Sequence, residues 1–291
     1  MSLRVVIAAL EESNCMKTRI ITGVVAGALL IGILLLPPFI AYCGFSLVCI
    51  LAVWEMFSAL GITKDRPLTV LSLVFAAAMP FAGWFQSIPV FYLTLAVYGM
   101  ALIGYQLYRH DTLQVRDTAV AFFMTLILSL GISCTVYCRK ADDFGLLYML
   151  MVLLIAWGSD MGAYFIGSFF GKHKLCPTIS PKKTVEGFFG GWICGVASAL
   201  LVAVLWDVAF LPTDVTVSYW KIAVLAFVLS PLSVMGDLFA SVVKRQVGAK
   251  DYGNIMPGHG GMMDRFDSIL AVASILAIIC SLINPVAPML P

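Results

Sequence analysis

The feature that most constrains this 291-residue chain is a series of apolar runs, each about as long as a membrane span, separated by polar segments. The hydrocarbon core of a bilayer is about 30 Å thick, so a helix needs about 20 mostly apolar residues to cross it. Backbone groups cannot stay unpaired in lipid, which favours helices for these runs. The runs predict nine spans, over residues 19–36, 39–60, 68–86, 89–108, 118–138, 144–169, 187–206, 220–243 and 265–284.

The composition agrees with a membrane protein. Apolar residues make up 61% of the chain and charged residues 12%, whereas an average soluble domain has about 45–50% apolar residues. We therefore expect an all-α, polytopic integral membrane helical bundle, a single domain with N-terminal helices over 1–143 and catalytic helices and loops over 144–291. A net charge of +2 is too small to indicate nucleic-acid binding. The eight cysteines form no CxxC pair that would indicate a metal or redox site.

The distribution of basic residues predicts the orientation, because cytoplasmic loops of membrane proteins collect Lys and Arg. With the N-terminus in the cytoplasm, 15 of the 18 basic residues fall on the cytoplasmic side, and only Arg139, Lys140 and Lys221 fall outside. Nine spans then place the C-terminus outside. Two of the predicted cytoplasmic loops, at 170–186 and 244–264, are long enough to be more than connections.

The spans before these two loops carry acids, Asp160 and Asp237. A carboxylate within a span costs about 2.5–3.5 kcal/mol on insertion scales, so it usually faces a cavity or a partner. One helix face carries four polar residues at spacings of i, i+4, i+7 and i+8: Asp237, Ser241, Lys244 and Arg245. Such a polar stripe indicates a helix face that contacts water. The alternatives are structural bonds between helices for the acids and snorkelling for the two basic residues.

The loop at 170–186 has the features of a phosphate site. Ser180 followed by Pro181 is typical of a helix N-cap and first turn, which would place Lys182 and Lys183 in that turn. The helix dipole disfavours lysines there unless an anion is bound. We therefore expect this loop to bind phosphate, either of a substrate or of an anionic lipid headgroup.

The segment KDYGNIMPGHGGMMDRFDS, at 250–268, is unusually polar for this chain. It contains one histidine and five charged residues: Lys250, Asp251, His259, Asp264, Arg265 and Asp267. Gly258, Gly260 and Gly261 allow positive φ and an anion-binding run of amides, although ordinary turn chemistry also explains them. The helix dipole alone could favour an acid at the start of the last span. Carboxylates suited to Mg²⁺ thus adjoin groups suited to phosphate, which indicates phosphoryl or nucleotidyl transfer to a lipid.

The run SVVKRQVGAKDYGNIMPGHGGMMDRFD resembles the signature of the phosphatidate cytidylyltransferases, also called CDP-diacylglycerol synthases. The pattern S-x-apolar-K-R, then K-D, then P-G-H-G-G-x-x-D-R-x-D fixes more than a dozen positions. The resemblance extends to the preceding GDL, to SPKKTVEG and to the Asp160 segment, over roughly residues 150–270. Met256 and Ala240 depart from the family pattern, and Ala240 removes a metal or nucleotide contact.

The resemblance implies that the phosphate of phosphatidic acid attacks the α-phosphate of CTP, forming CDP-diacylglycerol and releasing pyrophosphate. It implies Mg²⁺ between Asp237 and Asp264, allows a second, monovalent cation, and suggests a homodimer. With the charge pattern, it predicts these catalytic residues: Asp237, Asp264, Lys244, Arg245 and Asp267. The predicted substrate-binding residues are Asp160, Ser180, Lys182, Lys183, Ser241, Lys250, Asp251, His259, Gly260, Gly261 and Arg265.

Two other functions fit part of the pattern. A CTP-dependent lipid kinase needs the same metal and nucleotide but transfers the γ-phosphate, so it releases CDP rather than pyrophosphate. A cation-coupled transporter would also have buried acids. It would not need the HGG turn or the two basic loops.

Overall fold

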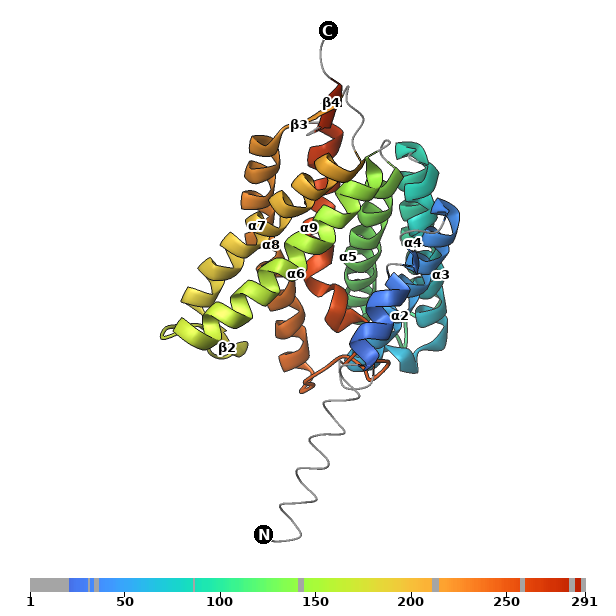
Figure 1. The fold of residues 1–291 in the computed structure, drawn as a ribbon. Coiled ribbons are helices and arrows are strands. Elements are labelled where there is room, and N and C mark those ends of the chain that lie inside the picture. Colours follow the sequence, from blue (N-terminus) through green and yellow to red (C-terminus); the bar gives the residue numbers. More distant parts are fainter. Residues whose placement is uncertain are drawn as a thin grey trace.

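The computed structural model describes residues 21–30, 32–33, 37–85, 87–140, 144–210, 215–256, 260–282 and 286–288. Long helices dominate these ranges (Figure 1). They are α2 (Pro38–Leu60), α3 (Arg66–Phe85), α4 (Ile88–Tyr108), α5 (Val115–Lys140), α6 (Gly145–Phe170), α7 (Val185–Phe210), α8 (Tyr219–Gln246) and α9 (Met263–Leu282). A short 3₁₀ helix, η1 (Ile62–Lys64), joins α2 to α3.

Seven of the described helices are long and apolar enough to cross a membrane. These are α2 to α8, and they correspond to the predicted spans from 39–60 to 220–243. The expected class, a helical multi-pass membrane protein, is therefore confirmed. Of the first predicted span, Ile21–Leu30 forms a shorter apolar helix, and α9 lies in the ninth predicted span. The count of nine remains a prediction.

Two small antiparallel sheets lie at opposite ends of the bundle (Figure 1). Strands β1 (Lys174–Cys176) and β2 (Ser180–Thr184) form a hairpin between α6 and α7. Strands β3 (Val215–Val217) and β4 (Val286–Pro288) pair at the other end. The first hairpin shares its end of the bundle with the loop between α8 and α9.

The predicted N-cap at Ser180 is wrong. Ser180–Thr184 is strand β2, and α7 begins at Val185. The hydroxyl Oγ1 of Thr184 accepts a hydrogen bond from the backbone N–H of Gly187 at 3.1 Å, so Thr184 is the cap. Pro181 fits here because both strands of a two-stranded hairpin are edge strands, which tolerate proline. Lys182 and Lys183 consequently lie on a strand instead of a first helical turn.

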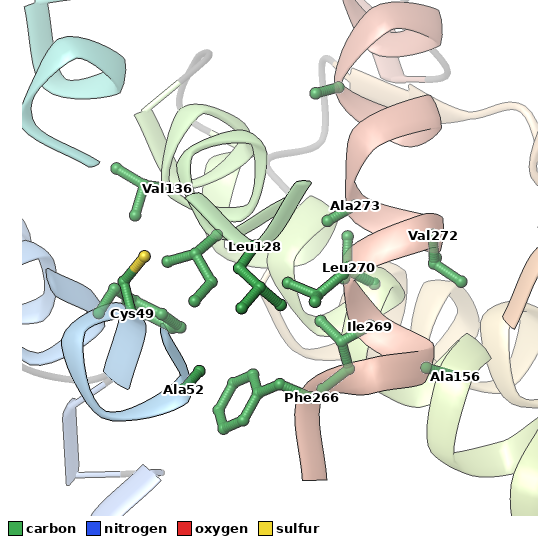
Figure 2. Packing of buried hydrophobic residues seen from close by; sticks show 14 of the residues in the cluster. Cys49, Ala52, Leu128, Val136, Ala156, Phe266, Ile269, Leu270, Val272 and Ala273 are labelled. Carbon is green, nitrogen blue, oxygen red and sulfur yellow. The ribbon is translucent and has the colours of Figure 1, made fainter. Parts of the chain in front are cut away.

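Helix α9 packs among α2, α5, α6 and α8, and this packing forms the core. Figure 2 shows Ile269 and Leu270 of α9 pointing toward Leu128 of α5, and the ring of Phe266 lying beside Ala52 of α2. All five side chains are buried. In lipid, helices associate through close van der Waals contact, so this interlocking fixes where α9 starts relative to its neighbours.

Helices α6 and α7 form a second closely packed pair. A Cβ placed on Gly191 of α7 would lie 2.5 Å from the carbonyl oxygen of Ser159 on α6, so only glycine allows this approach. The hairpin between the two helices is thereby held against the C-terminal end of α6.

Candidate active site

Most of the predicted site residues gather at the end of the bundle that carries the β1–β2 hairpin (Figure 1). Two contacts join its segments. The guanidinium Nε of Arg245, near the end of α8, donates to the carbonyl oxygen of Ile179 in the hairpin at 3.1 Å. The hydroxyl of Ser268 on α9 donates to Oδ2 of Asp160 on α6 at 2.8 Å. The two predicted loops and the two acid-bearing spans therefore form one site.

A pocket of about 690 Å³ opens between α6, the hairpin, α7 and α8. Its polar lining comprises Asp160, Asp237, Ser180, Lys174, Lys182 and Lys183, among other residues. The sequence predicted all of these except Lys174. Carboxylates and ammonium groups on one wall suit a ligand that carries both phosphate and a bound cation.

Asp237 lies on α8 and faces the hairpin. The ammonium group of Lys183 on β2 forms an ion pair with Oδ2 of Asp237, and both side chains are about three-quarters buried. The hydroxyl of Ser241 approaches Oδ1 of the same carboxylate at 3.4 Å. The hairpin that carries the lysines and the polar stripe of α8 thus contact each other directly, as a shared site requires.

The side chain of Asp264 is almost fully buried. The ammonium group of Lys244 donates to Oδ1 of Asp264 at 2.7 Å, and only 11% of the Lys244 side chain and 4% of the Asp264 side chain are exposed. This burial contradicts the snorkelling alternative for Lys244. Oδ2 of Asp264 accepts from the backbone N–H groups of Tyr252 at 2.9 Å and Gly261 at 3.0 Å. Because these donors precede Asp264 in the chain, its carboxylate fixes the loop, which goes beyond a helix-capping role.

Tyr252 completes the surroundings of Lys244. Its ring centroid lies 5.3 Å from the ammonium nitrogen, within the range of a cation–π interaction. Its hydroxyl donates to the carbonyl oxygen of Ala240 at 2.7 Å. Burial, together with the nearby Asp264 carboxylate, raises the pKa of the Tyr252 hydroxyl, so this group stays a neutral hydrogen-bond donor.

Asp267 lies one turn after Asp264 and is 8% exposed. It accepts from the backbone N–H of Ser268 at 2.8 Å. Its charge interacts with those of Asp237, Lys244 and Asp160. Acids from α6, α8 and α9 therefore lie near one another, an arrangement that a cation would stabilise.

These carboxylates suit Mg²⁺ by their chemistry, since this ion prefers oxygen ligands. Within the described residues, however, no three or more His, Cys, Asp or Glu side chains are grouped so as to hold a metal. The two acids predicted to share the metal each contact an ammonium group instead, Lys183 at Asp237 and Lys244 at Asp264. Both carboxylates thus stabilise a positive charge where they stand, and their assignment to Mg²⁺ remains a prediction.

The loop between α8 and α9 carries the other predicted residues. Gly260 has φ of 85°, which confirms the expected positive φ, and its added Cβ would lie 3.5 Å from Asp251. The backbone N–H of Gly261 donates to Asp264, so a bound anion would compete with this carboxylate for the same hydrogen bond. Lys250, Asp251 and Arg265 are exposed. His259 lies outside the described residues.

Besides Lys174, three contacting residues were not among the predicted site residues: Tyr252, Ser268 and Glu55. Glu55 lies on α2, and its Oε2 accepts from the backbone N–H of Met263 at 2.9 Å. A lone acid inside an apolar span was a signal for it. No pattern marked Tyr252 or Ser268, whose partners depend on the tertiary fold.

Comparison with known proteins gives the family. The profile of the Cytidylyltransferase family matches residues 17–283. The chain belongs to the cytidylyltransferase family. The match includes the N-terminal helices, so likeness to the family is not confined to residues 150–270.

Individual members of the cytidylyltransferase family match along nearly their whole length. A phosphatidate cytidylyltransferase of Staphylococcus epidermidis is 32% identical over 271 residues, covering 91% of this chain and 98% of that protein. Proteins of the same name from Staphylococcus saprophyticus and Staphylococcus aureus are 31% identical over 278 and 268 residues, with the same coverage. The predicted family membership is confirmed.

Proposed function

We propose that the chain transfers the cytidylyl group of CTP to phosphatidic acid. A phosphate oxygen of phosphatidic acid attacks the α-phosphorus of CTP, the bond from this phosphorus to the β-phosphate bridging oxygen breaks, and pyrophosphate leaves with that oxygen. CDP-diacylglycerol is the lipid product. The observation that carries this proposal is the likeness, over 91% of the chain, to relatives named phosphatidate cytidylyltransferase.

The charges of the pocket support this reaction. Both reactants are anions, so catalysis depends on positioning them and stabilising the charge that builds up during transfer. Lys174, Lys182 and Lys183 line the pocket and can bind phosphate oxygens. A protein nucleophile is unnecessary because the lipid phosphate is already ionised. Binding of a phosphate by Lys183 would release this lysine from Asp237.

Asp237 and Asp264 would hold Mg²⁺, with Asp160 and Asp267 adding negative charge nearby. Bound there, the ion would neutralise phosphate charge, and a second, monovalent cation would have the same effect. The residues' own part is to hold the phosphates with ammonium groups and to keep the lipid phosphate in line with the α-phosphorus. A homodimer, which the family resemblance suggests, remains a prediction.

The proposed topology has nine spans, a cytoplasmic N-terminus and the pocket at the cytoplasmic face. One contact supports this topology by joining the basic ends of α3 and α4. The hydroxyl of Tyr105 near the end of α4 donates to Asp65 at the start of α3 at 2.7 Å, close in sequence to Lys64 and Arg66. Lys221 lies in the first turn of α8 and Arg245 in its last turn, about 36 Å away at 1.5 Å per residue.

The test of the proposed activity uses purified protein, phosphatidic acid and CTP labelled either at the α- or at the γ-phosphate. Cytidylyl transfer moves only the α-label into the lipid and releases labelled pyrophosphate from γ-labelled CTP. Movement of the γ-label into the lipid, with CDP as the other product, would identify a lipid kinase and overturn the proposal.

A further inference from the structure

Glu55 is an acid of the N-terminal helices that contacts the loop of the proposed site. It is 3% exposed on α2, and its Oε2 accepts the backbone N–H of Met263, 208 residues away in the chain, at 2.9 Å. Met263 is the first residue of α9, and Asp264 follows it directly. The Glu55 carboxylate therefore contacts the backbone immediately before Asp264.

Two glycines of the loop enclose the same carboxylate. A Cβ placed on Gly253 would lie 2.4 Å from Oε1 of Glu55, and one placed on Gly261 would lie 2.4 Å from Oε2. Such distances leave no room for a methyl group without moving the acid or the backbone. The loop thus lies against Glu55 at two points, Gly253 and Gly261.

Burial of Glu55 is costly for folding. Its Oε1 has no hydrogen-bond partner among the described residues, and its charge also interacts with that of Asp264. A buried, incompletely bonded carboxylate beside a like charge destabilises a protein. Burial of this carboxylate therefore lowers stability, so stability alone does not account for its place against the loop.

We propose that Glu55 is a positioning residue for cytidylyl transfer, which holds the loop between α8 and α9 so that Asp264 meets Lys244. Gly261 connects the two acids, since its backbone contacts Glu55 and its N–H donates to Asp264. Loss of Glu55 would free the loop, and Asp264 would lose the geometry in which it accepts the amides of Tyr252 and Gly261. This inference rests on the proposed function, because it takes Asp264 as part of that site.

The first measurement is hydrogen exchange in purified protein, which requires no assumption about the reaction. Glu55→Ala should speed exchange of the amides of Tyr252, Gly261 and Met263 relative to wild type, while the interiors of α6 and α7 keep their protection. Ser46→Ala, a buried change on the same helix, is the matched control and should leave the loop amides protected. If these loop amides exchange at the wild-type rate in Glu55→Ala, the inference is overturned.

The second measurement is steady-state kinetics with CTP and phosphatidic acid. Glu55→Ala should lower kcat about tenfold or more with a KM for CTP within about twofold of wild type, because the lysines of the hairpin are untouched. Glu55→Gln, which keeps an acceptor for the Met263 N–H, should recover part of kcat. A rise in KM alone, or equal loss in the Ala and Gln variants, would contradict a positioning role through this hydrogen bond.

The variant Gly253→Ala covers the case in which Glu55→Ala does not fold. Gly253→Ala places its methyl group against Oε1 and should lower kcat, while Asn254→Ala, an exposed neighbour, serves as the control. In the Glu55→Gln background, Gly253→Ala should still lower kcat, because the glutamine amide fills the space beside position 253. Where Glu55→Ala folds, Gly253→Ala should lower kcat little further in that background, because the space is then empty. Equal kcat for Gly253→Ala and Asn254→Ala would overturn the inference.

Failure of wild-type protein to label the lipid would instead refute the proposed function. Hydrogen exchange of the loop amides would then still test the contact between Glu55 and the loop.

Discussion

The buried ion pair between Lys244 and Asp264 gives the sharpest quantitative prediction. Lys244→Met keeps most of the side-chain volume and removes the charge. Asp264, whose side chain is 4% exposed, then keeps only its two backbone donors and loses its cationic partner. Removal of one partner of a buried pair costs about 3–5 kcal/mol. The two remaining amides stabilise the carboxylate, so we expect a loss near the lower end, about 3 kcal/mol of unfolding free energy.

The measurement is reversible unfolding in mixed micelles, with Arg245→Met as the matched control. Arg245 is the next residue and carries the same charge, but it is exposed. Its loss should cost no more than about 1 kcal/mol, as for other exposed charges. If Lys244→Met costs no more than Arg245→Met, the reasoning from burial is refuted.

The double variant Lys244→Met, Asp264→Asn separates stability from chemistry. With both charges gone, no uncompensated buried charge remains, so stability should recover partly relative to Lys244→Met alone. Cytidylyl transfer should not recover, because both groups are assigned to the site. Recovery of activity together with stability would make the pair purely structural.

Three further predictions test other contacts. Asp237→Asn and Asp264→Asn should each abolish the same Mg²⁺-dependent step, and the double variant should be little worse; additive losses with wild-type Mg²⁺ titration curves would refute a shared metal. Lys183→Met should raise the KM for CTP about tenfold or more, while Lys172→Met, outside the pocket lining, serves as the control; equal KM values would remove Lys183 from phosphate binding. Tyr252→Phe should cost about 1 kcal/mol of unfolding free energy through the lost bond to the Ala240 carbonyl, and no change in stability would contradict that bond.

Much of the fold could be predicted because bilayer thickness sets the length of an apolar run. The acids of the site were equally visible, since Asp160 and Asp237 are costly inside spans unless they face a polar surface. The segment Ser180–Thr184 was mistaken because a Ser-Pro pair fits both a helix start and an edge strand. The structure distinguishes the two, because the hydroxyl of Thr184 caps α7 and the helix therefore begins after Ser180–Thr184.

The partners of the charged residues could not be predicted in the same way. Helical spacing correctly placed Asp237 and Lys244 on one polar stripe, but it does not say that the first pairs with β2 and the second with α9. Those choices depend on how α8 packs against the hairpin and against α9. The metal assignment rests on the family resemblance for the same reason, because carboxylate chemistry alone does not distinguish an ammonium partner from Mg²⁺.

The packing of α9 explains why the N-terminal helices matter to a site whose signature lies in the C-terminal half. Asp264 and Asp267 both stand on the first turns of α9. One face of that helix packs on α6 and α8, which carry Asp160 and Asp237, while another packs on α2 and α5 through Phe266 and Leu270 (Figure 2). Without α2 and α5 this apolar face would lose its partners, and less packing would oppose a shift or rotation of the helix start. A rotation of α9 by one residue, about 100°, would carry both acids away from Lys244. The N-terminal helices therefore position the acids of α9, and Glu55 contacts the backbone of the site directly.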